Sequence, residues 1–501
     1  MKLLEGANRS ARRPCYFHDY DRTLGLDRPA KSLQRRLFKA LDVDLDQLDV
    51  RQLVLGQPIV AADDAALEDQ AIAWLQEFVR IDTINPPGNE SRAVDFLGAI
   101  LTAEGIPWQS AESAEGRGNL WARLEGGDQP ALILLQHTDV VPADPKYWTT
   151  EPLSGDLRDG YIWGRGTLDM KGTGISQLTS FIRLHRAGLP LNRDVVLVAT
   201  ADEEAGGLFG AGWLLEHHPE IFEGAGILLN EGDGGTERDG QITFSVEVTQ
   251  KVPVWIRLTA VDTPGHGSMP NPTSSVTRIV EALNRLREHA FPARIIPPVD
   301  GMFKGMAANM TGDSEFVKAY ADMGNAIREP GFLERLQVHS PALHALTRDT
   351  CSLTRMQASN KINVVPPEAW AEIDCRMLPD RPAEEFVQDV RELLEGTGVE
   401  IEVLMAFTPA VSPTGTELYR AIEAIVAEHH PGSQVFPAVS TGFTDSHFTR
   451  DAGIDSYGFD PVVIPEKEWS RIHGNDERIS VENFRRGLRD MYAIISEVVY
   501  E

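Results

Sequence analysis

Seven side chains in this sequence have the types that bind metal ions and move protons, and they follow apolar runs or lie in loops: His137, Asp139, Asp169, Glu203, Glu204, Glu231 and His473. Imidazole nitrogens and carboxylate oxygens suit Zn²⁺, Mn²⁺ or Co²⁺ better than metals that prefer thiolates. If these groups converge, so many carboxylates cannot all stay ionised without cations. The sequence then favours two divalent ions bridged by one carboxylate, an arrangement that brings the pKa of a water toward neutrality.

A water activated in this way still needs a general base that is not itself a metal ligand. Glu203 and Glu204 are adjacent, and neighbours on an extended segment point in opposite directions, so one could bind metal while the other reaches the water. His137 and Asp139 are two residues apart and point the same way on such a segment, so Asp139 could hold the ring N–H of a ligated His137. Alternatively, the acidic triplet at 202–204 begins a helix, where acidic residues are favoured.

Three apolar segments must position these residues. Residues 131–136, 194–201 and 226–230 have the composition of buried strands, and each precedes one or more candidate ligands. The segments between and after them have helical patterns, including 174–187 and 210–217. This alternation predicts a parallel sheet with helices on both faces, and sites in such sheets gather at the carboxyl ends of the strands.

The pattern changes near residue 247, where long alternating strands and two or more helices predict an antiparallel α+β unit. We therefore predict an α/β catalytic domain with a mixed, mostly parallel sheet between helices, interrupted by an inserted α+β lid or dimerisation domain. The predicted boundaries are an N-terminal extension at 1–60, catalytic segments at 61–246 and 407–501, and the inserted domain at 247–406. The extension carries 11 Lys and Arg against 8 Asp and Glu, and 32–41 has helical spacing.

Composition excludes several classes of partner. The 501-residue chain has a formal net charge of -28, which argues against binding to nucleic acid or an anionic membrane. No apolar run reaches membrane-spanning length. Its 3 cysteines are too few and too scattered for a disulfide framework or a CxxC zinc site, so a cytoplasmic location is the simplest expectation. The glycine-rich run at 160–174 lacks the order of residues found in nucleotide-binding loops.

Four motifs carry a resemblance to a known family: His137-x-Asp139-Val-Val-Pro, Asp169-Met-Lys-Gly, Asp202-Glu203-Glu204 and a final His473. Together they resemble the zinc-dependent exopeptidases and amidohydrolases that include aminoacylase-1, acetylornithine deacetylase, succinyl-diaminopimelate desuccinylase and glutamate carboxypeptidase. The resemblance covers roughly residues 65–500. An insert at 292–352 is similar to the longer-lidded branch of carboxypeptidase S, and it would wall the substrate pocket or replace a dimer partner.

The resemblance implies a role for each residue at the predicted metal centre. His137 would bind one zinc, Glu204 and His473 would bind the other, and Asp169 would bridge them, with a cis peptide bond after it. Glu231 would complete the first zinc site, although nearby Asp233 is an alternative. Glu203 would be the general base, and Asp139 would orient His137.

In the inserted domain, the resemblance implies that His266 polarises the scissile carbonyl, often from the partner subunit of a homodimer. Asn363 and Arg376 would hold the substrate's carboxylate, since the planar fork of arginine binds a carboxylate bidentately. Outside the inserted domain, Asp445 and His447 belong to a loop that we expect beside the site, where they would support it without touching the substrate.

These expectations combine into a dinuclear zinc hydrolase, with Co²⁺ or Mn²⁺ as substitutes, that cleaves an amide next to a free carboxylate. The favoured substrate is an N-acyl amino acid. A dipeptidase or carboxypeptidase acting on small peptides remains open, as does a catalytically silent binding protein of the same fold.

Overall fold

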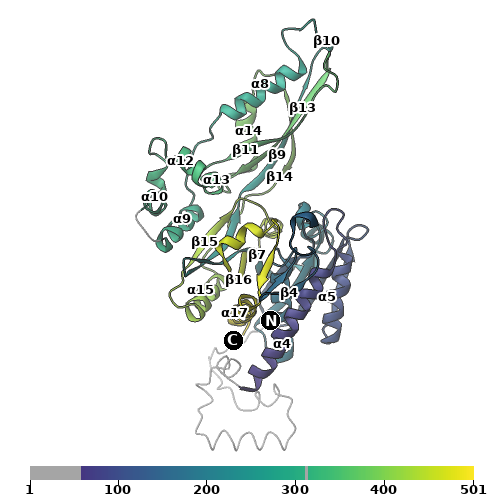
Figure 1. Ribbon diagram of the computed structural model, residues 1–501, viewed down its shortest axis with the longest axis vertical. Coiled ribbons are helices and arrows are strands. Elements are labelled where there is room, and N and C mark those ends of the chain that lie inside the picture. Colours follow the sequence, from purple (N-terminus) through teal and green to yellow (C-terminus); the bar gives the residue numbers. More distant parts are fainter. Residues whose placement is uncertain (1–57, 311–313, 501) are drawn as a thin grey trace, which may run out of the picture.

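The computed structural model describes residues 58–310 and 314–500, with side chains from residue 64 (Figure 1). The N-terminal extension and its predicted helix at 32–41 lie outside the described residues. Within the described ranges, no helix has both the length and the apolar character needed to cross a bilayer.

An eight-stranded mixed sheet forms the larger part of the molecule, with strand order β1-β2-β6-β3-β7-β16-β8-β15. Its four central strands β6, β3, β7 and β16 are parallel to one another, which confirms the predicted mixed sheet. The strands are β1 (Trp108–Glu112), β2 (Gly118–Leu124), β3 (Gln129–His137), β6 (Arg193–Thr200), β7 (Ala225–Arg238), β8 (Gln241–Gln250), β15 (Val435–Ser440) and β16 (Asp455–Pro465).

Helices cover both faces of this sheet. In β3, Leu132 and Leu134 belong to one apolar cluster, whereas Ile133 and Leu135 belong to a second cluster on the other face. Because both faces are buried, the strand is a continuous apolar run rather than an alternating one. The first cluster involves α4 (Pro58–Arg80), α5 (Ser91–Ala103), α6 (Lys171–Ala187), α15 (Glu417–His429) and α17 (Val481–Val499), and the second involves α7 (Ala211–His217).

A small antiparallel sheet ties the segment before α17 to the glycine-rich run. Its strand order is β17-β5-β4, with β4 (Asp156–Arg158), β5 (Tyr161–Trp163) and β17 (Arg478–Ser480). The pairing of β17 with β5 brings the loop that contains His473 toward the loop that contains Asp169.

A separate antiparallel sheet forms the inserted part, with order β11-β13-β9-β14. Two helices pack on one of its faces. A short two-stranded sheet, β10 with β12, lies at the end farthest from the main sheet (Figure 1). The elements are β9 (Val252–Val261), β10 (Gly265–His266), α8 (Ser275–Glu288), β11 (Thr350–Gln357), β12 (Val364–Val365), β13 (Glu368–Met377), α14 (Ala383–Leu393) and β14 (Glu400–Ala406). The predicted domain boundaries remain predictions, although the change of sheet falls between β8 and β9.

The insert at 292–352 is mostly helical and has its own apolar cluster, which includes Val439 of β15. Its helices are α9 (Pro297–Asn309), α10 (Glu315–Ala321), α11 (Met323–Ala326), α12 (Phe332–His339) and α13 (Pro341–Ala345). Helix α9 packs against β15, so the insert lies at an edge of the main sheet. Its two predicted roles, a wall of the substrate pocket or a substitute for a dimer partner, remain untested.

Two of the cysteines form a bond that the sequence analysis did not expect. Cys351 and Cys375 lie directly opposite each other on β11 and β13, with a Cα–Cα distance of 4.0 Å, and form a disulfide. Cross-strand pairing brings together residues that are 24 apart in the sequence, which spacing alone did not reveal. The cytoplasmic location stays a prediction.

Candidate metal centre

Asp169 lies at the middle of the converged side chains and presents one oxygen to each of two histidines. Its Oδ1 is 3.2 Å from Nε2 of His137, and its Oδ2 is 3.0 Å from Nε2 of His473. A glutamate accompanies each histidine: Glu231 lies 3.4 Å from His137 and Glu204 lies 3.1 Å from His473. The structure therefore brings together the five predicted ligands as two His–Glu pairs around one carboxylate. The peptide bond after Asp169 is cis, as expected.

Glu231 occupies its place because β7 does not end where the sequence predicted. The strand continues to Arg238, but its register against β16 jumps from Asn230 to Asp233. Such a bulge re-aims side chains, and here it directs Glu231 to His137. Asp233 is instead half-buried near Glu247, and its removal from water raises the pKa of Asp233 to about 6. The geometry therefore favours Glu231 over the alternative Asp233.

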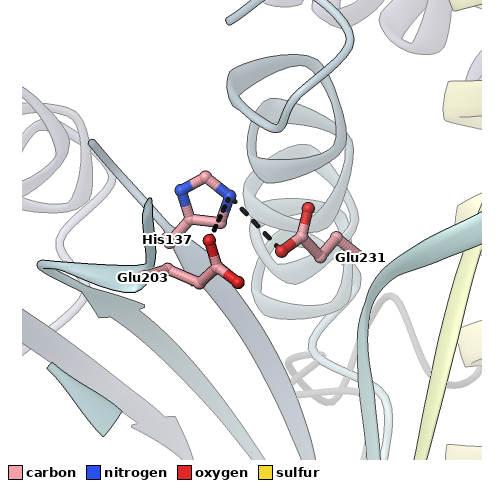
Figure 2. Close-up of side chains that lie close together, drawn as sticks. All are labelled: His137, Glu203 and Glu231. Atoms are coloured by element: carbon pink, nitrogen blue, oxygen red, sulfur yellow. Dashed lines mark ion pairs between the residues drawn. The ribbon is translucent and has the colours of Figure 1, made fainter. Parts of the chain in front are cut away.

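The segment that contains Glu203 and Glu204 is a turn, so the expectation of an extended segment was wrong. Asp202 has a left-handed backbone (φ 70°), and a short 3-10 helix, η3 (Glu203–Ala205), follows. Both glutamates nevertheless reach the cluster. Figure 2 shows Glu203 beside His137 together with Glu231, and Oε2 of Glu203 is 3.9 Å from Nε2 of His137. Glu203 is thus farther from this nitrogen than Asp169 or Glu231.

Asp139 holds both this turn and the ring of His137 in place. Its carboxylate accepts hydrogen bonds from the backbone N–H groups of Glu203 (3.2 Å) and Glu204 (3.1 Å). The Nδ1 atom of His137 lies 3.1 Å from the backbone oxygen of Asp139 and 3.4 Å from its carboxylate. Asp139 therefore contacts His137 chiefly through its carbonyl, which leaves Nε2 of the ring facing the acidic cluster.

Burial and the negative charges of neighbouring carboxylates shift the pKa values of these groups. Burial, reinforced by the nearby charge of Glu231, holds the pKa of Glu203 well above its usual range. Burial likewise raises the pKa of Glu231 to about 7 and, helped by the charge of Asp169, raises the pKa of Glu204. Hydrogen bonds to Asp169 and Glu204 raise the pKa of His473 to about 10. The cluster therefore retains protons that divalent cations would displace.

The donor set fits divalent metal ions. Two groups of imidazole and carboxylate atoms lie close enough to share an ion: His137 with Glu203 and Glu231, and His137 with Asp169 and Glu204. Oε1 of Glu204 is buried and has no hydrogen-bond partner among the described residues. A cation would satisfy this oxygen, because unpaired buried polar atoms are costly. The identity of the metal is not fixed by these contacts, since Zn²⁺, Co²⁺ and Mn²⁺ accept the same donors.

A buried ion pair that was not expected from the sequence joins the two loops of the centre. Nη1 of Arg165 lies 2.5 Å from Glu477, and Nη2 donates to the carbonyl of Gly474 (2.8 Å), next to His473. Glu477 accepts a hydrogen bond from the backbone of Leu168 (2.8 Å), next to Asp169. Both residues flank predicted ligands in the sequence, but nothing in the pattern indicated that they pair.

Two of the three residues predicted from the inserted domain, His266 and Asn363, lie far from the metal centre of their own chain. His266 belongs to β10 at the far end of this domain, where the carbonyl of Asn363 accepts a hydrogen bond from Gly267 (Figure 1). Arg376 is at the opposite end of β13, whose 10 residues extend about 33 Å. Asn363 and Arg376 of the same chain therefore cannot hold one carboxylate together, and their shared role remains a prediction that needs a second chain.

Arg376 retains a free donor beside the main domain. Its Nε and Nη2 atoms bond to Asp374 (2.8 and 3.2 Å), whereas Nη1 is buried without a hydrogen-bond partner among the described residues. The guanidinium lies 5.7 Å from the ring of Phe443. Phe443 is two residues from buried Asp445, which accepts a hydrogen bond from Thr200 (2.9 Å) at the end of β6. Arg376 thus faces the loop that borders the metal centre.

His447, in the same loop, is buried and stacks on Phe407 at 3.6 Å between ring centroids. Its Nδ1 lies 2.8 Å from the carbonyl of Thr444, and burial lowers the pKa of His447 to about 4. A neutral, stacked ring fits the supporting role expected of it, which stays a prediction.

Comparisons of the sequence and of the fold with known proteins agree on one family. The sequence pattern of Peptidase family M20/M25/M40 matches residues 133–497. The N-fatty-acyl-amino acid synthase/hydrolase PM20D1 of Xenopus tropicalis is 33% identical over 369 residues, covering 72% of this chain and 71% of the relative. Aminoacylase-1 of Mus musculus is 27% identical, covering 86% and 95%. The fold resembles that of an M20 family metallo-carboxypeptidase from Sulfolobus solfataricus, with a TM-score of 0.65, 18% identity, and 85% and 99% coverage.

Proposed function

The chain belongs to peptidase family M20/M25/M40 and is a hydrolase of amide or peptide bonds, and we propose that it is a dinuclear zinc enzyme that removes the acyl group from N-acyl amino acids. One observation carries the dinuclear part of this proposal: Asp169 offers one oxygen to each of two His–Glu pairs. The 33% identity with a relative named as an N-fatty-acyl-amino acid synthase/hydrolase supports the acyl substrate.

In this proposal, His137, Glu231, Asp169, Glu204 and His473 hold the ions. When bound, the ions supply Lewis acidity that acidifies a water and polarises the amide carbonyl. Glu203 takes a proton from that water and later gives a proton to the leaving amine.

Arg376 is proposed to bind the substrate's carboxylate. Two of its nitrogens are held by Asp374, so the side chain is already oriented, and Nη1 has no hydrogen-bond partner among the described residues. A free carboxylate can accept from this nitrogen with a charge-assisted hydrogen bond. This contact would place the free carboxylate of the substrate on the side of the metal centre that the 441–447 loop borders.

A substrate panel tests the proposed function. Zinc-loaded protein is incubated with N-acyl amino acids, their carboxyl-amidated counterparts and unblocked dipeptides, and released amines are measured by mass spectrometry. We expect cleavage of the N-acyl amino acids and much slower cleavage of the amidated forms, because Arg376 then has no carboxylate to bind. Cleavage of dipeptides alone would instead make the protein a dipeptidase or carboxypeptidase.

We further propose that the protein works as a homodimer, in which the β10–β12 end of one chain reaches the metal centre of its partner. The support is geometric: His266 and Asn363 are exposed at this end, far from their own metal centre, whereas Arg376 is near it. Such an exchange in a two-fold dimer would complete both sites.

Mixing two inactive variants checks this arrangement. His266→Ala and Glu203→Gln are expected to be inactive separately, because each removes a group from every site. After subunit exchange, about one quarter of the wild-type rate should return, since half of the dimers are mixed and one site in each is complete. Absence of recovery in demonstrably mixed dimers would contradict the arrangement. His266→Ala that retains the wild-type rate would also contradict it.

A further inference from the structure

A cavity of about 110 Å³ opens beside the metal centre and takes no part in the mechanism described above. Asp169 and Glu231 form the wall toward the metal centre. The rest of the lining comes from β7, β16, the N-terminal part of α6, a short 3-10 helix, η5 (Glu466–Arg471), and two loop residues, Leu168 and Ile472. Its position directly against two proposed ligands means that part of a bound substrate could enter it.

The lining of this cavity is more apolar than polar. Val462, Ile464, Trp469 and Ile472 contribute carbon surface, and Gly232 contributes backbone without a side chain. The indole N–H of Trp469 is already used, because it donates to the hydroxyl of Thr236 (3.0 Å). An apolar group of the substrate would therefore gain the free energy of leaving water here, whereas a polar one would find few partners.

The one acidic side chain in the lining away from the proposed ligands is Asp460, and its oxygens are already bonded. Oδ2 accepts from the hydroxyl of Thr173 (2.5 Å), and Oδ1 accepts from the backbone N–H of Val462 (3.0 Å). No Lys or Arg is among the lining residues. A substrate group that ends in a carboxylate would consequently be buried beside another carboxyl group with no Lys or Arg in the lining to pair with it.

The cavity and Arg376 lie next to different residues of the metal centre. Arg376 faces the loop at 441–447, whose Asp445 accepts a hydrogen bond from Thr200 at the end of β6. The cavity touches Asp169 and Glu231 instead. A substrate whose carboxylate is held by Arg376 would span the metals and direct its acyl group toward the cavity.

From this geometry we propose that the cavity is the acyl subsite and that it selects neutral, medium-length acyl chains over both acetyl and carboxylate-ended groups. The inference rests on the proposed N-acyl amino acid hydrolase function. At roughly 10–15 Å³ for each water-sized group, a volume of 110 Å³ accepts a chain of about seven to eleven such groups. Each buried methylene is expected to raise kcat/KM by roughly fourfold until the cavity is full.

The test measures kcat/KM for zinc-loaded protein with a series from N-acetyl to N-palmitoyl derivatives of one amino acid. We expect a rise to about eight carbons and no further gain beyond. N-pentanoyl and N-succinyl derivatives match in length but differ in charge, so comparing them separates the effect of charge from that of chain length. The pentanoyl substrate should be cleaved at least about tenfold faster, and Asp460→Asn should reduce this ratio.

Two variants should move the optimal acyl chain length in opposite directions. Ile464→Phe reduces the cavity and should shift the optimum to shorter chains, whereas Trp469→Leu enlarges it and should shift the optimum to longer ones. Ile242→Phe adds the same volume on β8, outside the lining, and serves as the control that leaves the profile unchanged. Because the two shifts have opposite signs, a loss of folding in one variant cannot imitate the result.

The outcomes separate this inference from the proposed function. Cleavage of N-acetyl substrates with a flat chain-length profile, unaffected by either variant, would overturn the acyl subsite and leave the hydrolase function standing. A shift in preference among amino-acid side chains, rather than acyl chains, would also overturn it and assign the cavity to the amino-acid half. If no N-acyl amino acid is cleaved, the proposed function itself fails.

Discussion

Replacing Glu203 with glutamine is expected to lower kcat at least about a hundredfold while the protein still binds its metal ions. Glutamine keeps the shape of the side chain but cannot accept a proton from the attacking water. Glu203 is also the farthest of the acidic neighbours of His137, at 3.9 Å, so the five proposed ligands can hold the ions without it. Steady-state kinetics together with metal analysis of the same sample would measure both parts.

Two neighbouring substitutions serve as controls for Glu203→Gln. Glu204→Gln is expected to lose metal as well as rate, because Glu204 is 3.1 Å from His473 and belongs to a proposed ligand set. Asp233→Asn should keep its rate within a few-fold, since Asp233 lies near Glu247 and not among the groups that act on His137. If Glu203→Gln loses metal in the way that Glu204→Gln does, Glu203 is a ligand and the general base lies elsewhere.

Removing the metal ions is expected to abolish activity and to make stability fall steeply as pH rises from 5 to 8. In the metal-free protein, burial raises the pKa of Glu231 to about 7, and hydrogen bonds raise the pKa of His473 to about 10. Burial also raises the pKa values of Glu203 and Glu204. Each of these groups therefore holds more protons when the protein is folded than when it is unfolded.

The sign of the pH effect follows from this difference in bound protons. A group that binds more protons in the folded state loses its contribution to stability as pH rises from its unfolded to its folded pKa. For the glutamates this window begins near pH 4.5, and for His473 it extends from 6.5 to about 10. The Tm of chelator-treated protein should thus decrease between pH 5 and pH 8.

Adding metal should reverse this trend, because cations replace the bound protons. Zn²⁺ at a hundred times its Kd would stabilise the folded protein by about 2.7 kcal/mol per site. Calorimetric titration in buffers of different ionisation enthalpy should detect proton release on binding. A chelator-treated protein whose Tm stays flat across this pH range, or responds equally to metal after Asp169→Ala, would contradict a cation-dependent cluster.

Much of the metal centre could be predicted from the sequence because its residues follow apolar strands. His137 ends β3 and Glu204 follows β6 closely, and parallel strands bring such ends to one edge of a sheet. Glu231 was predicted as a ligand because it was expected to follow the end of a strand, which is only partly correct. It lies within β7 rather than at its end, and a bulge aims it at the centre. A bulge changes register against a distant strand, so it leaves no local pattern.

Features that depend on contacts between distant segments could not be predicted. Arg165 and Glu477 are 312 residues apart, and only the pairing of β5 with β17 brings their loops together. The same limitation applies to the cavity, whose lining combines residues from β7, β16, α6 and η5. In the inserted domain, the sequence indicated His266, Asn363 and Arg376 but not that β13 places them at opposite ends.

The central claim is that this chain hydrolyses N-acyl amino acids with two metal ions held around Asp169. The most direct measurement is a titration of metal-free protein with Zn²⁺, in which hydrolysis of an N-acyl amino acid and bound zinc are followed together. We predict that the rate rises to a plateau at two bound ions per chain. Equal rates in metal-free and metal-loaded protein, or a plateau with no bound zinc, would contradict the account.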